Sequence, residues 1–263
     1  MKTIVITGST RGIGYGLAEQ FLMRGCSVVI SGRTQEAVDQ AVTKLSQTYD
    51  PAKMLGYPCD VRQRDQIEKL WHSAQAKFGQ IDIWINNAGI GTQPQNFWEL
   101  PPDTQQAVVE VNTLGLMHGC SVAIQGMLAQ GSGFIYNMAG LGSDGRRVNR
   151  ILLYGTTKYA LTYLTDGLAR ELKDSPVKIG ALSPGMVITD LLMGDYEEGS
   201  AEWKHAKKIF NILADRVETV TPWLVDKMLS NQKNGVWVRW LTTPKIIWRF
   251  MSAPILKRDP FRD

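Results

Sequence analysis

Short apolar runs alternate with longer segments of helical periodicity along the chain, and this alternation restricts the possible folds more than any other feature. The runs are rich in Val and Ile, which is typical of strands covered on both faces of a parallel sheet. We predict seven strands, at residues 3–7, 27–31, 53–57, 82–86, 133–137, 177–183 and 235–240, with helices at residues 12–24, 35–48, 63–78, 103–129, 155–173 and 217–231. The pattern indicates an α/β fold: a single doubly wound Rossmann domain over residues 1–263, with a seven-stranded parallel sheet flanked by helices.

Two segments interrupt this alternation. Residues 184–215 form a long excursion after the sixth strand, and a long loop within a compact domain often acts as a lid or a binding loop. Residues 241–263 form a tail rich in aromatic and basic side chains. Two interpretations of the tail stay open. It contacts a membrane surface or a pigment–protein complex, or Trp237, Trp240 and Trp248 complete the core or a subunit interface.

Composition excludes several functional classes. The chain has 263 residues, of which 44% are apolar, and its net charge of +4 does not indicate nucleic-acid binding. Its three cysteines and three histidines are scattered, so we expect neither a disulfide framework nor a metal site. The first strand starts at Thr3, and no apolar run reaches the ~20 residues of a membrane span. We therefore expect a cytoplasmic protein without a signal or transit peptide.

A glycine-rich turn directly follows the first strand. It reads Thr7-Gly8-Ser9-Thr10-Arg11-Gly12-Ile13-Gly14. Glycines at these spacings permit a sharp turn and let the backbone approach a pyrophosphate, while the following helix presents free amides to the phosphates. Such turns also occur for purely structural reasons, but the position between a strand and a helix favours a dinucleotide-binding site.

The end of the second strand indicates which dinucleotide binds. An NAD site usually carries an acidic residue here that binds the ribose 2′-hydroxyl. This chain has Ser31, Arg33 and Thr34 instead, with Arg11 in the glycine-rich turn, whereas Glu36 falls in the first turn of the next helix. Guanidinium and hydroxyl groups suit a 2′-phosphate, so we expect NADPH/NADP as the cofactor. The alternative is that both arginines are solvated surface residues.

Tyr154 and Lys158 lie four residues apart at the start of a predicted helix, on one face. The ordinary pKa of tyrosine, about 10, is too high for efficient proton shuttling at neutral pH. A nearby ammonium group would lower this pKa, which makes the pair a candidate proton donor. The pattern alone is common, so its significance depends on the other motifs.

Together these motifs resemble the short-chain dehydrogenase/reductase family over essentially the whole chain. The resemblance rests on the glycine-rich turn, Asp60-Val61, Asn86-Asn87-Ala88-Gly89, Asn112, the Tyr154/Lys158 pair and Pro184-Gly185-Met186-Val187-Ile188-Thr189. It implies that Asp60 and Val61 contact the adenine, that residues 86–89 lie along the cofactor, and that Pro184, Gly185, Val187, Ile188 and Thr189 bind towards its nicotinamide end. It also implies that Tyr154 is the general acid, that Lys158 binds the nicotinamide ribose and that Asn112 supports a proton-relay water.

The chain departs from the family pattern at the catalytic serine. That serine normally lies 13 residues before the tyrosine, where this chain has Leu141, and the nearest serine is Ser143. We expect a displaced loop to bring the Ser143 hydroxyl to the carbonyl oxygen, where it would polarise the bond. The alternative is that Ser143 is only a turn residue.

This departure points to one branch of the family. The segments Asn137–Gly145, Tyr154–Lys158, Ser183–Leu192, Ala206–Ala214 and Arg239–Thr242 resemble the chlorophyll(ide) b reductase branch, although Ala139 stands where we expect an acid in the plant members. The resemblance implies NADPH-dependent reduction of the C7 formyl group of chlorophyll b or chlorophyllide b. Two alternatives remain: a reductase of another bulky aldehyde or ketone (fatty-acyl, steroid or xenobiotic), and a non-catalytic dinucleotide sensor, which would not need Tyr154 and Lys158.

The partners follow from the same resemblance. It implies a tetrapyrrole substrate and a homo-oligomer built through helices 103–129 and 155–173. It also places the protein at the periphery of a photosynthetic membrane.

Overall fold

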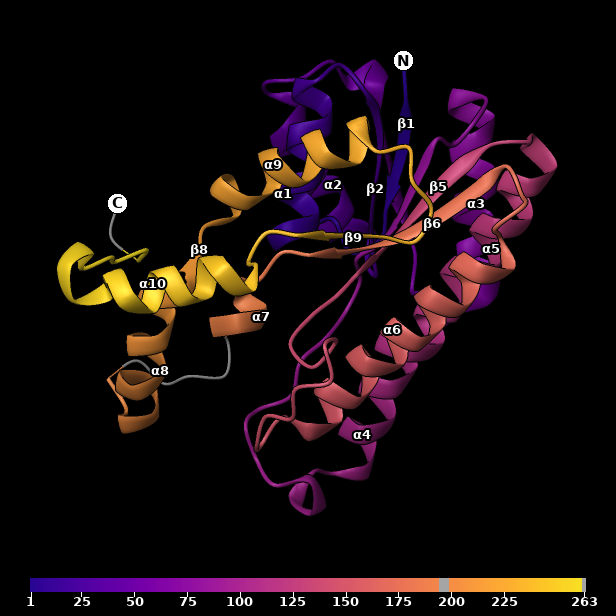
Figure 1. Ribbon diagram of the computed structural model, residues 1–263. Coiled ribbons are helices and arrows are strands. Elements are labelled where there is room, and N and C mark those ends of the chain that lie inside the picture. Colours follow the sequence, from indigo (N-terminus) through magenta and orange to yellow (C-terminus); the bar gives the residue numbers. More distant parts are fainter. Residues whose placement is uncertain (194–198, 262–263) are drawn as a thin grey trace.

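The computed structural model describes residues 1–193 and 199–261, and its centre is a seven-stranded parallel sheet (Figure 1). The strand order is β3-β2-β1-β4-β5-β6-β9, with all six pairings parallel. The strands are β1 (Thr3–Ile6), β2 (Ser27–Gly32), β3 (Met54–Pro58), β4 (Ile83–Asn86), β5 (Gly133–Met138), β6 (Val177–Ser183) and β9 (Val236–Arg239). Each lies within one residue of its predicted bounds, so the predicted Rossmann fold is confirmed.

Helices cover both faces of the sheet. The described helices are α1 (Gly12–Met23), α2 (Gln35–Ser46), α3 (Arg64–Phe78), α4 (Pro102–Val109), α5 (Gly115–Gln130), α6 (Leu152–Glu171), α7 (Asp190–Met193), α8 (Ala201–Leu213), α9 (Val217–Ser230) and α10 (Thr243–Leu256). Of these, α7, α8 and α10 lie beside the sheet rather than on its faces (Figure 1). Successive strand residues point to opposite faces. Ile4 and Ile6 therefore pack with α1, α2 and α9, whereas Val5 packs with α3, α5 and α6. This two-sided burial explains why the strands are nearly continuous apolar runs.

One helix is longer and more apolar than the others. A π-helix at Glu110–Leu114 joins α4 to α5 without a break. By length and composition alone, the resulting helix Pro102–Gln130 could cross a membrane, which the sequence analysis did not expect. In the structure it packs against α3 and α6, which is typical of a core helix.

The segment between β6 and α9 contains more regular structure than the predicted excursion. It holds β7 (Met186–Val187), α7, α8 and β8 (Ala214–Asp215), and β7 pairs with β8 in a second, two-stranded sheet. In α8, Trp203 and Phe210 are buried against Phe261 of the tail. Most of the tail is itself helical, as α10, which packs on α8 (Figure 1). The sequence analysis missed both helices because their apolar faces pack on each other rather than on the main sheet.

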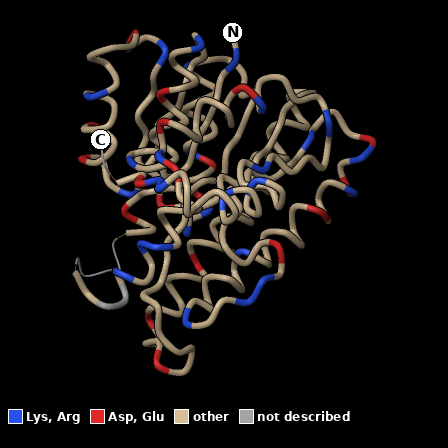
Figure 2. The backbone as a smooth tube through the Cα atoms, turned by 60° about the vertical axis from the view of Figure 1, so that its left-hand side comes forward, with Lys and Arg blue, Asp and Glu red and all other residues tan. Residues whose placement is uncertain are grey.

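The strand order reverses direction between β1 and β4. In open α/β sheets, ligands bind outside the carboxyl ends of the strands at this switch point. The glycine-rich turn follows β1 and the segment Asn86–Gly89 follows β4, so the fold brings these two motifs together. Basic and acidic positions are interspersed along the backbone (Figure 2).

Candidate active site

The glycine-rich turn lies closely against the segment that follows β4. Gly8 has a φ of +63°, and a Cβ atom there would lie 2.8 Å from the Ala88 backbone. A Cβ on Gly14 would collide with the Gly8 carbonyl. The Asn87 side chain donates hydrogen bonds to the carbonyl oxygens of Thr7 (3.0 Å) and Gly8 (2.9 Å). Only glycine therefore fits at positions 8 and 14 of this turn, which we call the cofactor cradle. Its open backbone at the start of α1 suits a pyrophosphate.

Two other predicted cofactor residues have internal partners. The Ser9 hydroxyl donates to the Ile6 carbonyl (2.7 Å) and accepts from the Ser31 amide (2.9 Å), and Ser9 is fully buried. The Asn86 side chain accepts from the Trp84 indole (2.7 Å) and donates to Asn137 (2.9 Å). These side chains support the strands beneath the site. Thr10 and Ile13 are half-buried in the turn itself.

Arg11 and Arg33 reach in different directions. Arg11 forms an exposed ion pair with Asp190 of α7 at 3.2 Å. Arg33 is exposed, and its charge helps to lower the pKa of Asp60, after the larger effect of hydrogen bonds from Arg62. The Thr34 side chain accepts from the Ala37 amide (3.3 Å) and so caps α2. Arg33 therefore remains available for a 2′-phosphate, whereas Arg11 would first have to leave Asp190.

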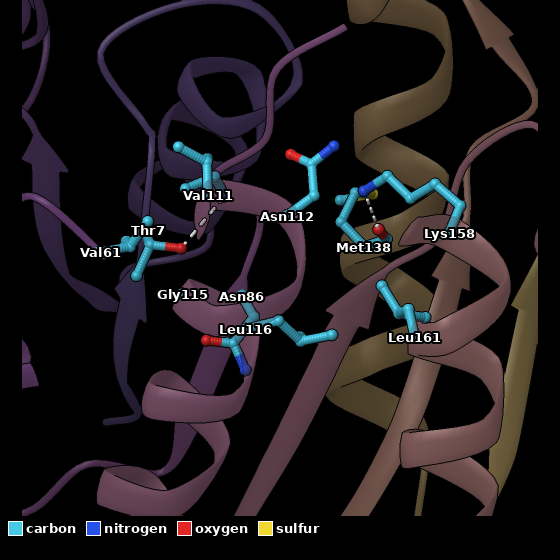
Figure 3. Close-up of a pocket in the computed structure, with 11 residues that line it drawn as sticks. Thr7, Val61, Asn86, Val111, Asn112, Gly115, Leu116, Met138, Lys158 and Leu161 are labelled. Carbon is cyan, nitrogen blue, oxygen red and sulfur yellow. Dashed lines mark hydrogen bonds between the residues drawn. The ribbon is translucent and has the colours of Figure 1, made fainter. Parts of the chain in front are cut away.

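The pocket between β1, β4 and α6 is lined by two of the predicted catalytic residues, Asn112 and Lys158 (Figure 3), whereas Tyr154 and Ser143 do not line it. Lys158 is buried, and its Nζ donates to the Met138 carbonyl at 3.0 Å. The Tyr154 hydroxyl lies against Gly140, where a Cβ atom would collide with it. The pocket is lined by Thr7, Val61, Asn86, Ala88, Val111, Asn112, Gly115, Leu116, Met138, Lys158 and Leu161. The fold thus joins the segments after β1, β3, β4 and β5 to the start of α6.

Burial shifts the pKa values of both members of the pair. It raises the pKa of Tyr154 to about 12 and lowers the pKa of Lys158 to about 8. The sequence analysis expected the ammonium group to lower the tyrosine pKa. This expectation is not met, because loss of solvent dominates and the lysine amine is bonded to Met138. Tyr154 therefore holds its proton at neutral pH, as a proton donor requires.

Ser143 lies beside the tyrosine despite its shifted position in the sequence. A turn at residues 140–143 brings the Ser143 Oγ within 3.0 Å of the Gly140 amide, which donates to it. The same Gly140 contacts the Tyr154 hydroxyl. Ser143 is buried, its carbonyl accepts from Thr162 (2.6 Å), and Leu141 is 40% exposed. Ser143 therefore closes the turn at residues 140–143, and its role as the polarising hydroxyl stays a prediction.

Asn112 lies in the π-helix and fixes the segment after β4. Its Oδ1 accepts from the Ile90 amide (2.9 Å), while its Nδ2 donates to the Ile90 carbonyl (2.8 Å) and Thr157 Oγ1 (3.2 Å). A π-turn within an α-helix is frequently found at a functional site. Asn112 and Lys158 both lie beside Gly89.

The sequence analysis gave no role to Asn137 or Thr157. Asn137 pairs in register with Asn86 on the neighbouring strand, and its Nδ2 donates to Thr165 (2.9 Å). Thr157 is buried and lies on the same helix as Tyr154. Two amide side chains at the ends of adjacent apolar strands were the signal that could have revealed this network.

The segment Pro184–Thr189 closes over the glycine-rich turn. Gly185 has a φ of +76° and lies against Leu241, and Thr189 lies 3.4 Å from where a Gly12 Cβ atom would be. The Ile188 amide donates to the Asp215 carbonyl at 3.0 Å. Val187 is buried in β7. The predicted nicotinamide-end residues are therefore held in place by β8.

The buried carboxylate of Asp215 holds the C-terminal tail against β8. Asp215 accepts from the Trp240 indole (2.6 Å), the Arg249 guanidinium (2.9 Å) and the Arg258 guanidinium (2.7 Å). The two arginines also donate to the carbonyl oxygens of Ile212, Leu213 and Ala214. We refer to Asp215, Trp240, Arg249 and Arg258 as the Asp215 cluster. It ties the tail to β8 and, through β8, to the segment over the glycine-rich turn.

Comparison with known proteins identifies the family. The short chain dehydrogenase model matches residues 2–199. The chain belongs to the short-chain dehydrogenase/reductase family. Two solved members are similar in fold at 26% identity and a TM-score of 0.79: a 3-ketoacyl-(acyl-carrier-protein) reductase from Brucella melitensis complexed with NADH, and ElxO with NADP bound. They cover 91% and 90% of this chain, and 96% of each of those chains is covered.

Curated members of the family are more similar in sequence. The chain is 40% identical over 260 residues to the chloroplastic chlorophyll(ide) b reductase NOL of Oryza sativa subsp. japonica, covering 95% of this chain and 74% of that protein. It is 34% identical to the probable chlorophyll(ide) b reductase NYC1 of Arabidopsis thaliana, covering 100% of this chain and 55% of that protein. The protein is therefore an oxidoreductase of the short-chain dehydrogenase/reductase family with a nicotinamide cofactor, and it has chlorophyll(ide) b reductase homologues.

Proposed function

We propose that this protein uses NADPH to reduce the C7 formyl group of chlorophyll b or chlorophyllide b to a hydroxymethyl group. One observation carries the proposal. The match to the short chain dehydrogenase model ends at residue 199, whereas similarity to the chlorophyll(ide) b reductase covers 95% of the chain. Beyond residue 199 the similarity therefore extends over most of α8–α10, including Asp215 and Trp240, and we propose that this region forms the substrate side.

The site geometry suits this chemistry. Reduction of an aldehyde requires a hydride at carbon and a proton at oxygen, and the bound nicotinamide supplies the hydride. Tyr154 donates its proton to the forming alkoxide. The Ser143 hydroxyl polarises the carbonyl. Lys158, which lies beside Gly89, binds the nicotinamide ribose, as the resemblance to the family implies. Aldehyde, NADPH and one proton thus give alcohol and NADP.

The direct test is product formation. Purified protein is incubated with NADPH and chlorophyllide b, and the 7-hydroxymethyl product is separated and identified by mass spectrometry. We expect stoichiometric loss of NADPH and of the formyl absorption band. No product, alongside efficient turnover of steroid ketones, would favour the alternative suggested by a 3alpha-hydroxysteroid dehydrogenase of Mediterraneibacter gnavus, which is 32% identical over 73% of this chain.

The preference for NADPH rests on Arg33. It follows β2 without a bonded partner among the described residues, and Glu36 points away into the first turn of α2. Replacing Arg11 and Arg33 with Ala should raise the Kd of NADPH by about 10- to 100-fold, because hydrogen bonds to charged groups are lost. The Kd of NADH should change little. Equal losses for both cofactors would contradict this assignment.

Two surfaces support proposals about partners. Ile247, Trp248, Met251 and Ile255 form an exposed apolar stripe on α10, which suits the surface of a photosynthetic membrane. Trp237 and Trp240, by contrast, pack against the two core clusters, which supports the interpretation that they complete the core, whereas Trp248 is exposed. Exposed apolar residues on α4–α6, including Met117, Tyr159 and Tyr163, support a homo-oligomer. Liposome flotation tests the first proposal, and light scattering tests the second.

A further inference from the structure

The loop at residues 141–150 joins two catalytic groups. It starts beside Gly140, contains Ser143, and ends four residues before Tyr154. Gly142 lies against Gly155, and Gly145 lies against Tyr159, so the loop follows the N-terminal end of α6. Tyr154 lies in the first turn of α6, so the loop borders the candidate catalytic tyrosine.

Most arginines in the described part of the chain are engaged by other groups. Arg24, Arg62, Arg64 and Arg146 bond to carboxylates of the fold, as do Arg11, Arg249 and Arg258. Arg216 bonds to a carbonyl, and Arg239 lies over Trp237. Within residues 1–193 and 199–261, only Arg33, Arg147, Arg150 and Arg170 have no such side-chain partner.

The distribution of these four residues is informative. Arg33 lies where a cofactor phosphate is expected, and Arg170 lies in the last turn of α6, far along the helix from Tyr154. Arg147 and Arg150 lie together on the loop beside the catalytic serine. The one acidic residue of that loop, Asp144, is already bound by Arg146 at 2.6 Å. Arg147 and Arg150 are both exposed and have no bonded side-chain partner among the described residues, so their guanidinium groups are available to an anion.

The backbone holds Arg150 in a specific conformation. Its φ of +69° is unusual for a residue other than glycine, and such strain persists only where the surroundings impose it. The Gln95 amide donates to the Arg150 carbonyl at 2.8 Å, which joins this loop to the segment after β4. The guanidinium is therefore carried by a braced turn rather than by a free loop tip.

We propose that Arg147 and Arg150 bind a carboxylate of the substrate, so that the enzyme prefers the free acid of its substrate over an ester. A guanidinium pairs with a carboxylate through two parallel hydrogen bonds, and two of them can share one anion. This inference rests on the proposed function and deepens it. Chlorophyllide b carries a free propionate, whereas in chlorophyll b the same group is esterified with phytol. The loop then selects chlorophyllide b.

The test compares chlorophyllide b with its methyl ester, which differ only at the carboxylate. We expect kcat/KM of the wild-type protein to favour the acid by about 10- to 100-fold, mostly through KM, because charged hydrogen bonds discriminate by about this factor. The double variant R147Q/R150Q should lose this preference while it reduces the ester at the wild-type rate. R170Q is the matched control and should keep the preference.

Each other outcome has a defined meaning. Equal reduction of acid and ester by the wild-type protein would show that Arg147 and Arg150 do not bind the carboxylate, and it would leave the proposed function intact. If the protein reduces neither chlorophyllide b nor its methyl ester, the proposed function is wrong, and so is the proposed carboxylate binding. The variant R147K/R150K keeps both charges and should retain part of the preference. If the Gln and Lys variants both lose activity on the ester as well as on the acid, the arginines serve the loop structure and the proposal is wrong.

Discussion

Two regions of this molecule are built in different ways: the cofactor side around the glycine-rich turn, and the C-terminal region that we propose as the substrate side. On the cofactor side, glycines and neutral amides hold the turn after β1 against the segment after β4. On the substrate side, one buried carboxylate, Asp215, gathers two guanidiniums and an indole from the tail. The first arrangement uses the backbone and short motifs, and the second uses charged side chains that are distant in the sequence.

This difference indicates which region tolerates amino-acid substitutions without loss of the whole fold. The cofactor cradle shares its strands with the core, so substitutions there disturb the fold. The Asp215 cluster carries two positive charges against one negative charge at a buried site, so its stability depends on each partner. The substrate side is therefore a separately held unit, and the following variants test this separation.

Tyr154→Phe should have the largest effect on activity. It removes the transferred proton and leaves the cradle untouched, so turnover should fall by about 10³-fold or more, near the upper range for a general acid. Cofactor affinity, measured by fluorescence titration, should stay within about twofold of the wild-type value. Residual turnover within tenfold of the wild-type rate would contradict the assignment.

Asp215→Ala should weaken the substrate side by about 3 to 5 kcal/mol in free energy of unfolding, because two guanidiniums lose their carboxylate. Hydrogen exchange should increase in α8 and α10 while β1, β2 and β4 stay protected. The matched control is Asp190→Ala, which breaks the exposed pair with Arg11 and should cost less than about 1 kcal/mol. Similar losses in both variants, or faster exchange in the central strands, would show that the two sides are not separate.

Lys158→Met should stabilise the cofactor-free protein at neutral pH. Below about pH 8 the lysine is protonated in both the folded and unfolded states, so the fold bears the full cost of burying the charge. Between about pH 8 and 10.5 the unfolded chain binds the proton and the folded chain does not, so wild-type stability rises with pH. The variant should be more stable by at most about 3 kcal/mol at pH 7, and this advantage should shrink towards pH 10.

Thermal melting of both proteins from pH 7 to pH 10 measures this difference. Other titrating groups are common to the two proteins, so their effects cancel in the comparison. A constant gap across the range would mean that the pKa of Lys158 is not lowered by burial. The same variant should lose turnover.

Ser143→Ala should have the smallest effect of the four, a loss of about 10²-fold in kcat, as for other groups that stabilise a developing oxyanion. The double variant Leu141→Ser/Ser143→Ala places a serine at the usual family position. We expect no recovery, because Leu141 is partly exposed while Ser143 is buried beside Gly140. Full recovery would show that position 141 also reaches the carbonyl.

The seven-stranded sheet, the glycine-rich turn and the placement of Tyr154 and Lys158 on one helix could be predicted from the sequence alone. Each depends on local pattern: alternation of apolar runs, glycine spacing, or residues one helical turn apart. The sequence also shows that position 141 is a leucine and that Ser143 is the nearest serine to Tyr154 on that loop. These features need little information about distant contacts.

Other features depend on contacts between residues that are distant in the sequence, and these could not be predicted from it. The helices α8 and α10 and the small β7–β8 sheet depend on Asp215 meeting Arg249 and Arg258, a pairing that no local pattern reveals. The raised pKa of Tyr154 reflects burial by residues from several elements rather than the neighbouring lysine. Ser9 turns inward because Ile6 and Ser31 complete its hydrogen bonds. Burial and charge pairing are sums over neighbours in space, and the order of residues along the chain does not specify those neighbours.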